Sequence, residues 1–238
     1  MHDSKTRWLT RWSVASALAG AVALAVLLVL PQGRTVARTP LVGQARVIDG
    51  DTIEITGERV RLEGIDAPEV AQTCAARVGG TWPCGRDAAQ ALERLVAGRS
   101  LTCEDRGTDK YGRMLGVCFS GTRDVNAEMV RKGLAWAFVK YSHSYVHEEA
   151  QARAAALGIW QAEATPAWVY RAERWAGAED AAPQGCAIKG NISANGRIYH
   201  LPWTSWYGKV RIDERKGERW FCSEREALAA GWRPAVTH

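Results

Sequence analysis

Apolar and polar residues alternate with a period of two between residues 42 and 65, which is the pattern of strands with one buried face. In VGQARVIDGDTIEIT the alternation lies on both sides of Asp49-Gly50-Asp51, and this predicts two strands joined by a tight turn. GERVRLEGI, residues 57–65, predicts a third strand, and SLTCEDRGTDKYGRMLGVCF, residues 100–119, predicts a strand, a turn and a strand.

Apolar residues at helical spacing predict about three helices between and after these strands. The three segments are residues 84–98, 124–133 and 147–160. Gly98 ends the first helix, while Asp124 caps the second helix and Gly133 closes it. Short strands with interleaved helices predict an α+β fold, a five-stranded Greek-key β-barrel of the OB type with about three packed helices.

The region after residue 185 predicts a separate small α+β module, with short strands and a closing helix, SEREALAAG, capped by Ser223. We expect Trp203, Trp206 and Tyr207 to supply its core, because so small a module otherwise lacks one. The alternative is that these aromatic side chains are exposed and stack on bases or sugars.

An uncharged apolar run at residues 13–30 is about as long as a membrane-spanning helix. Lys5, Arg7 and Arg11 precede it, which favours a cytoplasmic N-terminus and export of the rest. We expect an uncleaved anchor, since LPQGRTVAR contains no clear small-x-small cleavage site; a cleaved signal peptide is the alternative. In either case we expect the bulk of the chain on the periplasmic or extracellular side.

These patterns divide the chain into six parts. They are a cytoplasmic N-terminus (1–12), a transmembrane anchor or signal (13–31), a spacer (32–41), the barrel domain (42–164), a helical extension and linker (165–184) and the C-terminal module (185–238).

Composition and charge add little to this division. With 47% hydrophobic and 24% charged residues, the chain is not disordered by composition. The net charge of +5 permits a polyanionic partner without identifying one. We expect a monomer, and no protein partner is predicted.

Six cysteines, an even number, favour disulfides in an oxidising compartment. Cys103 and Cys118 lie symmetrically about Lys110-Tyr111, so a hairpin that turns there places them opposite each other. Cys74 and Cys84 enclose a short loop, and Cys186 and Cys222 bracket the C-terminal module. We predict these three local bridges, although fifteen pairings exist and six reduced core thiols are the alternative.

Acidic residues gather where two of the predicted strands end. Asp49 and Asp51 flank a glycine, although Asp-Gly-Asp alone is typical of a turn. Asp66 and Glu69 lie on either side of Ala67-Pro68, where the proline ends the strand.

Strict alternation would place Arg61 and Asp66 on opposite faces of their strand. A shared site therefore requires a bulge or a bend, and Gly64 is the obvious position for it.

With such a bend, the residue types match the needs of phosphodiester hydrolysis. Asp51, Asp66 and a nearby backbone carbonyl offer hard oxygen ligands for Ca²⁺. Glu69 is a candidate general base for an attacking water. Arg61 and Arg113 are candidates for binding the phosphate, because a guanidinium matches phosphate oxygens in pairs.

Several of these motifs occur together in one known family. VIDGDTIEI, VRLEGIDAPE, CGRDAAQAL, TDKYGRMLG, VNAEMVRKGLAW and LGIW stand in the order and spacing of the staphylococcal nuclease family, also called thermonuclease or micrococcal nuclease. The chain resembles it over residues 43–160. The resemblance implies a five-stranded OB barrel with three helices and calcium-dependent cleavage of DNA and RNA on the 5′ side of the phosphodiester, leaving 3′-phosphates.

The resemblance also implies a metal site. Asp51 and Asp66 match the family's calcium ligands, and Asp49 matches an adjacent acidic residue. Ala67 stands where the family has a threonine whose backbone carbonyl binds calcium, a role that alanine can keep.

Five further residues match the positions that act on the substrate. Arg61 and Arg113 match two phosphate-binding arginines, and Glu69 matches the proposed base. Tyr111 matches a tyrosine beside the bound nucleotide, and we assign its neighbour Lys110 to the same substrate contact. Single-stranded substrates are expected to be favoured.

Two stretches depart from the family pattern. The loop CAARVGGTWPC carries two cysteines that the best-known member lacks, and YSHSYVHEEA replaces an aromatic-rich loop. His143 and His147 lie four apart, as in some zinc sites, but no third ligand has suitable spacing, and we expect them to face solvent.

The C-terminal module contains CAIKGNIS, IYH and GERWFCSEREALAAGW. With these motifs, residues 185–236 resemble the sunset domain found on exported or membrane-anchored proteins. That resemblance implies no activity. The alternative to a nuclease is a non-catalytic OB-fold protein that binds nucleic acid in the cell envelope. A third interpretation, an envelope adhesion or wall-binding protein that acts through this module, is compatible with nuclease activity.

Overall fold

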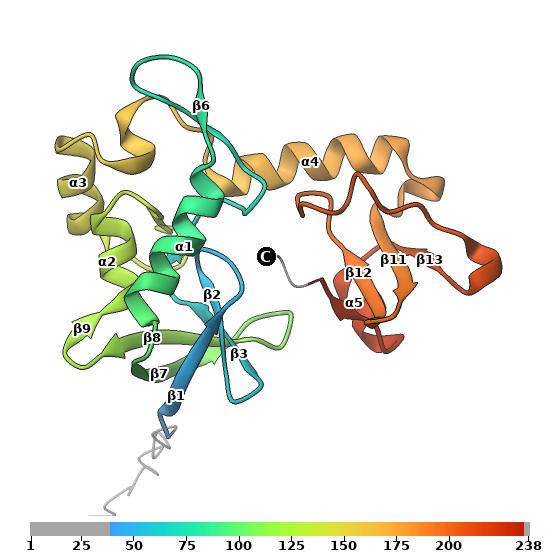
Figure 1. Ribbon diagram of the computed structural model, residues 1–238, viewed down its shortest axis with the longest axis horizontal. Coiled ribbons are helices and arrows are strands. Elements are labelled where there is room, and N and C mark those ends of the chain that lie inside the picture. The colour runs from blue at the N-terminus through green and yellow to red at the C-terminus, as the bar shows by residue number, and fades with distance from the viewer. Residues whose placement is uncertain (1–38, 236–238) are drawn as a thin grey trace, which may run out of the picture. The chain divides into compact units, whose positions relative to one another are not determined.

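The computed structural model of the protein describes residues 39–235 (Figure 1). Five strands form a closed barrel: β1 (Leu41–Val47), β2 (Thr52–Ile55), β3 (Glu58–Leu62), β7 (Ser100–Thr108) and β8 (Met114–Ser120). The pairs β1–β2, β2–β3, β1–β7 and β7–β8 are antiparallel, and the parallel pair β3–β8 closes the barrel. The predicted five-stranded barrel is thus confirmed.

Three helices cover the barrel strands, as predicted. They are α1 (Cys84–Val96), α2 (Val125–Arg131) and α3 (Val146–Ala154), which lie together above the strands in the view of Figure 1. Ala88, Leu92 and Leu95 of α1 are buried among strand residues such as Ile53 and Leu101. The predicted cap of α2 is also present, since the Asp124 side chain accepts a hydrogen bond from the Ala127 N–H.

Short elements connect these parts of the barrel domain. They are β4 (Ile65–Asp66), β5 (Cys74–Ala75), β6 (Thr81–Trp82), β9 (Arg123–Asp124), β10 (Trp136–Ala137) and the 3₁₀-helix η1 (Gly158–Gln161). Of these, β4 pairs with β10 in a separate two-stranded ladder, which places Trp136 opposite Asp66.

The backbone bends at Gly64, as the sequence analysis required. β3 ends at Leu62, and β4 begins at Ile65 after a turn in which Gly64 has a φ of +77°. A Cβ atom there would lie 3.0 Å from the ring of Tyr145, so both the conformation and the space favour glycine.

A long helix, α4 (Ala167–Ala181), follows the barrel domain and ends close to the 3₁₀-helix η2 (Pro183–Gly185). Most of the segment at residues 165–184, predicted as a helical extension followed by a linker, is therefore helical. Two contacts fix the first turn of α4 on the barrel domain: Gln72 donates to the carbonyl oxygen of Thr165 at 2.7 Å, and the Trp168 ring stacks on Phe138 at 5.5 Å.

The C-terminal module is a small α+β unit. Its elements are β11 (Ile188–Ser193), β12 (Gly196–His200), η3 (Glu214–Lys216), β13 (Arg219–Phe221), α5 (Glu224–Ala229) and β14 (Arg233–Pro234), and its sheet has the order β13-β11-β12-β14. Ser223 caps α5 by accepting a hydrogen bond from the Glu226 N–H, as predicted.

The aromatic core predicted for this module was wrong. Its buried cluster contains Ile188, Tyr199, Phe221, Ala227 and Trp232. Trp206 is 49% exposed instead, and Trp203 and Tyr207 are only partly buried. The reason is their place in the chain: they lie in the irregular segment between β12 and β13, whereas the core residues come from the strands, α5 and the turn after it.

All three predicted disulfides are present. The bridges are Cys74–Cys84, Cys103–Cys118 and Cys186–Cys222. Cys103 and Cys118 are direct partners across β7 and β8, which explains why a symmetric hairpin was a sufficient signal.

Among residues 39–235, no helix is both long enough and apolar enough to cross a membrane. The predicted anchor at residues 13–31 lies outside the described residues.

The bend at Gly64 generates a stability prediction. We expect Gly64→Ala to lower the free energy of unfolding by about 2–4 kcal/mol, because alanine is strained at positive φ and its methyl group meets Tyr145. The matched control is Gly57→Ala, since Gly57 has a φ of +85° but open space around it. Urea unfolding of both variants measures the difference, and equal losses would show that the contact with Tyr145 is unimportant.

Candidate active site

Asp51 lies buried at the start of β2, where the turn after β1 ends. Its Oδ2 accepts a hydrogen bond from the Ala67 N–H at 2.9 Å, and its Oδ1 accepts one from Arg61 Nη1 at 2.6 Å. β2 and β3 pair with Thr52 opposite Arg61, which brings the arginine to the end of β2 where Asp51 lies. Asp51 belongs to the bend just before β2, so register and bend together form the first ion pair of the site.

Asp66 joins the same cluster after the bend at Gly64. Its side chain is fully buried, and its Oδ1 accepts a hydrogen bond from Arg61 Nη2 at 2.8 Å. One guanidinium thus bridges Asp51 and Asp66. This confirms that the bend brings Arg61 and Asp66 together despite the strand alternation.

Glu69 lies at the edge of this cluster in a loop that is fixed on both sides. The Glu69 N–H donates to the Gln72 side chain at 3.2 Å, and the Gln72 N–H donates to the Glu69 carbonyl oxygen at 2.7 Å. Gly85, in the first turn of α1, lies so close that a Cβ atom there would be 1.7 Å from that oxygen. The neighbouring Cys74–Cys84 bridge closes the same loop, so the position of Glu69 is tightly constrained.

Burial sets the proton affinity of these carboxylates. Burial raises the pKa of Glu69 to about 8, although the charge of Arg171 acts to lower it. Burial and then the charge of Asp51 raise the pKa of Asp49 to about 6. Burial also acts to raise the pKa of Asp51, but the charge of Arg61 and the hydrogen bond from Ala67 outweigh it and hold that pKa below its usual range.

Lys110, Tyr111 and Arg113 lie together on the turn between β7 and β8. Asp109 accepts hydrogen bonds from the Tyr111 N–H at 2.9 Å and from Arg113 Nε at 2.8 Å, which fixes the turn and the guanidinium. The Lys110 amino group is 4.8 Å from the centre of the Tyr111 ring, and the Arg113 guanidinium is 5.4 Å from it. The Arg113 charge also helps to lower the pKa of Asp51, so it acts on the buried cluster.

One arginine of the site was not predicted. Arg171 of α4 donates to Asp66 Oδ1 at 3.1 Å, to Asp66 Oδ2 at 2.8 Å and to Glu69 Oε1 at 2.8 Å. The hydrogen-bonded residues are 105 and 102 positions apart in the chain. No local motif marks Arg171, and only the packing of α4 brings it to the carboxylates.

The donor set of the buried cluster suits a hard cation bound by few protein ligands. Asp51 and Asp66 offer carboxylate oxygens beside the Ala67 backbone, as calcium and magnesium prefer. Within residues 39–235, no group of three or more His, Cys, Asp or Glu residues is arranged to hold a metal ion. Any ion in this site would therefore complete its coordination with water or substrate.

His143, in the loop before α3, and His147, on α3, do not add a metal site in the part of the chain that the structure describes. His147 Nε2 is 2.8 Å from the side-chain nitrogen of Gln151, and both histidines are exposed.

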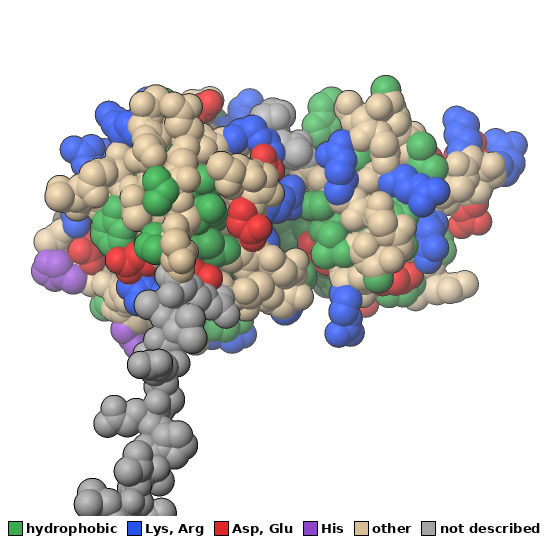
Figure 2. Space-filling view, turned by 90° about the horizontal axis from the view of Figure 1, so that it is seen from below, with side chains coloured by type: hydrophobic (Ala, Val, Ile, Leu, Met, Phe, Trp, Pro, Cys, Tyr) green, Lys and Arg blue, Asp and Glu red, His purple; other side chains and the backbone are tan. Residues whose placement is uncertain are grey.

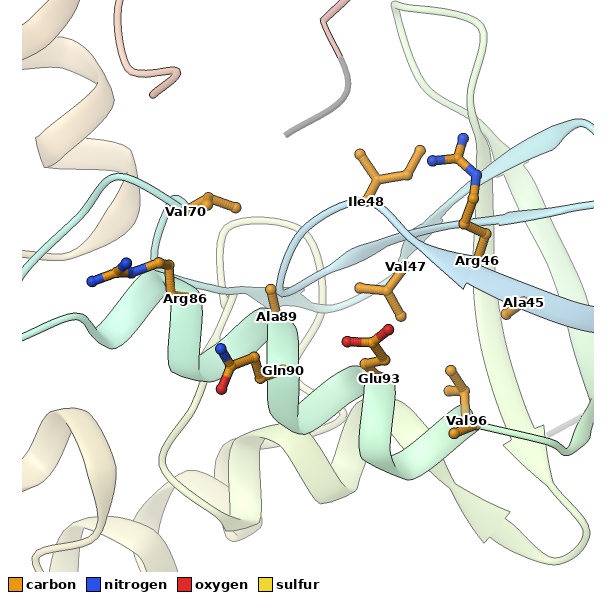
Figure 3. A pocket seen from close by; sticks show the side chains of 11 residues that line it. Ala45, Arg46, Val47, Ile48, Val70, Arg86, Ala89, Gln90, Glu93 and Val96 are labelled. Carbon is orange, nitrogen blue, oxygen red and sulfur yellow. The ribbon is translucent and has the colours of Figure 1, made fainter. Parts of the chain in front are cut away.

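A groove of about 500 Å³ lies between β1 and α1 (Figure 3). Figure 3 shows Val47, Ala89 and Glu93 along it, with Val70 and Arg86 at the left end and Ile48 above Val47. Ile48 directly precedes Asp49, and Val70 directly follows Glu69. The groove itself does not include Arg61, Asp66 or Glu69. The groove is therefore a neighbour of the candidate site and not part of it.

Comparison with known proteins agrees with the fold. Residues 59–162 match the family described as staphylococcal nuclease homologue. The succinoglycan biosynthesis protein ExoI of Rhizobium meliloti (strain 1021) is 41% identical over 58% of this chain and 74% of its own length. An uncharacterized endonuclease of Escherichia coli O157:H7 is 37% identical over 53% of this chain and 81% of its own. The micrococcal nuclease of Shigella flexneri is 32% identical over 53% of this chain and 77% of its own length. The chain belongs to the staphylococcal nuclease family.

The double ion pair of Arg61 predicts a large stability loss when its charge is removed. Arg61→Met leaves Asp51 without its bound guanidinium, and we expect the free energy of unfolding to fall by about 3 kcal/mol in the presence of EDTA. The control Arg46→Met removes an exposed pair with Glu54 and should cost about 1 kcal/mol or less. Urea denaturation compares them, and similar small losses would show that the buried carboxylates do not need Arg61.

Proposed function

We propose that the protein is a calcium-dependent endonuclease that hydrolyses phosphodiester bonds of DNA and RNA, with cleavage of the bond to the 5′ oxygen and a 3′-phosphate product. The observation that carries the proposal is the buried cluster in which Arg61 bridges Asp51 and Asp66 beside Glu69. Two relatives with endonuclease and nuclease names support it.

Binding of the phosphate falls to the two arginines. Arg113 is held by Asp109 on the turn after β7. Arg61, near the end of β3, is held by two aspartates. Such fixed guanidinium groups bind phosphate oxygens in pairs and stabilise the charge that develops during hydrolysis. Both guanidinium groups are positioned before the substrate arrives. Arg61 gives Nη1 to Asp51 and Nη2 to Asp66, so it must release at least one of these carboxylates to bind a pair of phosphate oxygens.

Glu69 is the proposed general base. Burial raises its pKa to about 8, which makes the ionised carboxylate a stronger base than an exposed glutamate. The water oxygen forms a bond to phosphorus while Glu69 takes its proton, and the bond from phosphorus to the 5′ oxygen breaks. The 5′ oxygen leaves with a proton from solvent, and the phosphate stays on the 3′ side.

Asp51, Asp66 and the Ala67 carbonyl are the residues proposed to hold Ca²⁺. When bound, such an ion supplies Lewis-acid polarisation of the phosphate and a place for the water. Asp49 tunes the site by its charge and does not need to bind the ion. Its observed contact is with the backbone of a proposed ligand, because Asp49 Oδ1 accepts a hydrogen bond from the Asp51 N–H at 3.0 Å.

Single strands are the proposed preferred substrate. Lys110 and Tyr111 are on the turn beside Arg113, where an unpaired base can stack on the ring and the amino group can meet a phosphate. On the face in Figure 2, Lys and Arg side chains are scattered among Asp and Glu, so overall charge on that face does not define a duplex-binding surface.

We also propose that the protein acts as a monomer outside the cytoplasm, held by its N-terminal apolar segment. Three disulfides among the described residues support an oxidising compartment. The C-terminal module is assigned no part in the chemistry.

Cleavage of single-stranded DNA tests the proposal directly. We expect residues 39–238, produced under oxidising conditions, to cleave it with Ca²⁺ and to lose all activity in EDTA. Glu69→Gln should lower the rate by about a hundredfold or more, because the base is lost while size is kept. Gel analysis of end-labelled products measures both the rate and the 3′-phosphate.

Glu93→Gln is the control, since Glu93 lies in the neighbouring groove on α1. It should keep its activity. Tight binding of the DNA by the wild-type protein without cleavage would instead indicate a non-catalytic nucleic-acid-binding protein.

The role of Arg113 gives a second test on the same substrate. Arg113→Ala should reduce kcat by about a hundredfold, as expected when a charge partner of the transition state is lost. Arg106→Ala is the control from the same hairpin, because Arg106 is exposed and pairs with Glu104. Initial rates at saturating DNA decide between them, and an unchanged kcat in Arg113→Ala contradicts the assignment.

A further inference from the structure

The first turns of α4 are fixed beside the strands that carry the buried carboxylates. Ala167 is fully buried in a cluster with Trp136 and Ile159, and the Trp168 ring contacts Trp136 at 5.9 Å. Arg171 lies four positions after Ala167 and three after Trp168, so it is on the same face of α4 as these two residues. The anchored turn therefore delivers its guanidinium to the site.

Arg171 holds Asp66 and Glu69 at the same time. It binds both carboxylate oxygens of Asp66 and one of Glu69, at distances of 2.8–3.1 Å. The side chains are shielded, since Asp66 is 0% exposed, Glu69 18% and Arg171 21%. A fork that meets a carboxylate at two oxygens in such surroundings is a strong interaction.

These contacts use the oxygens that a metal ion would need. Asp66 Oδ1 accepts hydrogen bonds from both Arg61 and Arg171, and Oδ2 accepts one from Arg171. A divalent cation that binds Asp66 directly takes lone pairs now directed at guanidinium N–H groups, and it repels their positive charge. Arg171 and the cation cannot both bind Asp66 fully.

We propose that Arg171 is an internal competitor of the divalent cation: it occupies Asp66 and Glu69 in the metal-free protein and must release Asp66 when the ion binds. Arg171 thereby sets the affinity of the site for its metal. It is a positioning residue, since in the metal-free state it also holds Glu69 in place beside Asp66. The inference rests on the proposed cation site.

Competition makes a directional prediction that a purely structural tie does not make. Removing the Arg171 charge should strengthen Ca²⁺ binding, because the ion no longer displaces a bound guanidinium. If Arg171 only held the carboxylates in place, its loss would leave Ca²⁺ binding unchanged or weaken it. The sign of the change in Kd therefore separates the two roles.

The experiment is calorimetric titration of the full chain with Ca²⁺, after removal of metal with EDTA and exchange into chelator-free buffer. We expect Arg171→Met to lower Kd by about tenfold or more relative to wild type. Arg171→Lys keeps a charge without the fork, and we expect it to lower Kd by about threefold. If circular dichroism shows that Arg171→Met is not folded, Arg171→Lys carries the test instead.

Arg174→Met is the matched control on the same helix. Arg174 contacts Tyr170 through its guanidinium, 5.1 Å from the ring centre, and it makes no part of the site. Its Kd should equal that of wild type. A further variant, Arg171→Met with Asp66→Asn, should lose the gain in affinity, because the vacated oxygens are those of Asp66.

Three results would overturn the inference. The first is an unchanged or higher Kd in the Arg171 variants while wild type binds Ca²⁺, which leaves the proposed function intact. The second is a gain in affinity that survives Asp66→Asn, which places the ion elsewhere. The third is no Ca²⁺ binding in wild type or in the variants, which removes the cation site and the inference with it.

Discussion

The carboxylates of Asp51 and Asp66 are stable in the protein interior because guanidinium groups bind them there. Their side chains are 5% and 0% exposed, and an ionised carboxylate without a partner is strongly disfavoured at such a depth. Arg61 bridges both, and Arg171 binds Asp66 from α4. Every other feature of the site serves to keep these charges at bonding distance.

The barrel brings these charges together by register and by one bend. Pairing of β2 with β3 sets Thr52 opposite Arg61, and the turn at Gly64 returns the chain so that Asp66 meets the same guanidinium. Since Gly85 allows α1 to approach the Glu69 backbone closely, the third carboxylate is fixed as well. Backbone geometry thus positions the site, and it depends on glycine at Gly64, for the bend, and at Gly85, for the close approach of α1.

Short-range signals made much of this predictable from the sequence. Alternation gave the barrel strands, the cap at Asp124 gave the start of α2, and hairpin symmetry gave the Cys103–Cys118 bridge. Arg171 could not be found in this way, because its partners are about a hundred residues away and helix packing alone joins them. The prediction that Trp206 lies in the core of the C-terminal module was wrong for a related reason, since composition does not say which aromatic residues reach a core.

The buried ion pairs also show which parts of the chain contribute charged residues to the site. The match to the family covers residues 59–162, which excludes Asp51 on one side and Arg171 on the other. Without β2 and the turn before it, Arg61 loses one of its two carboxylates, and without α4, Asp66 loses one of its two guanidinium groups. Buried charges need partners of the opposite sign. The unit that contains these ion pairs extends from the turn before β2 into α4, and in it the three carboxylates of Asp51, Asp66 and Glu69 outnumber the two guanidinium groups that bind them.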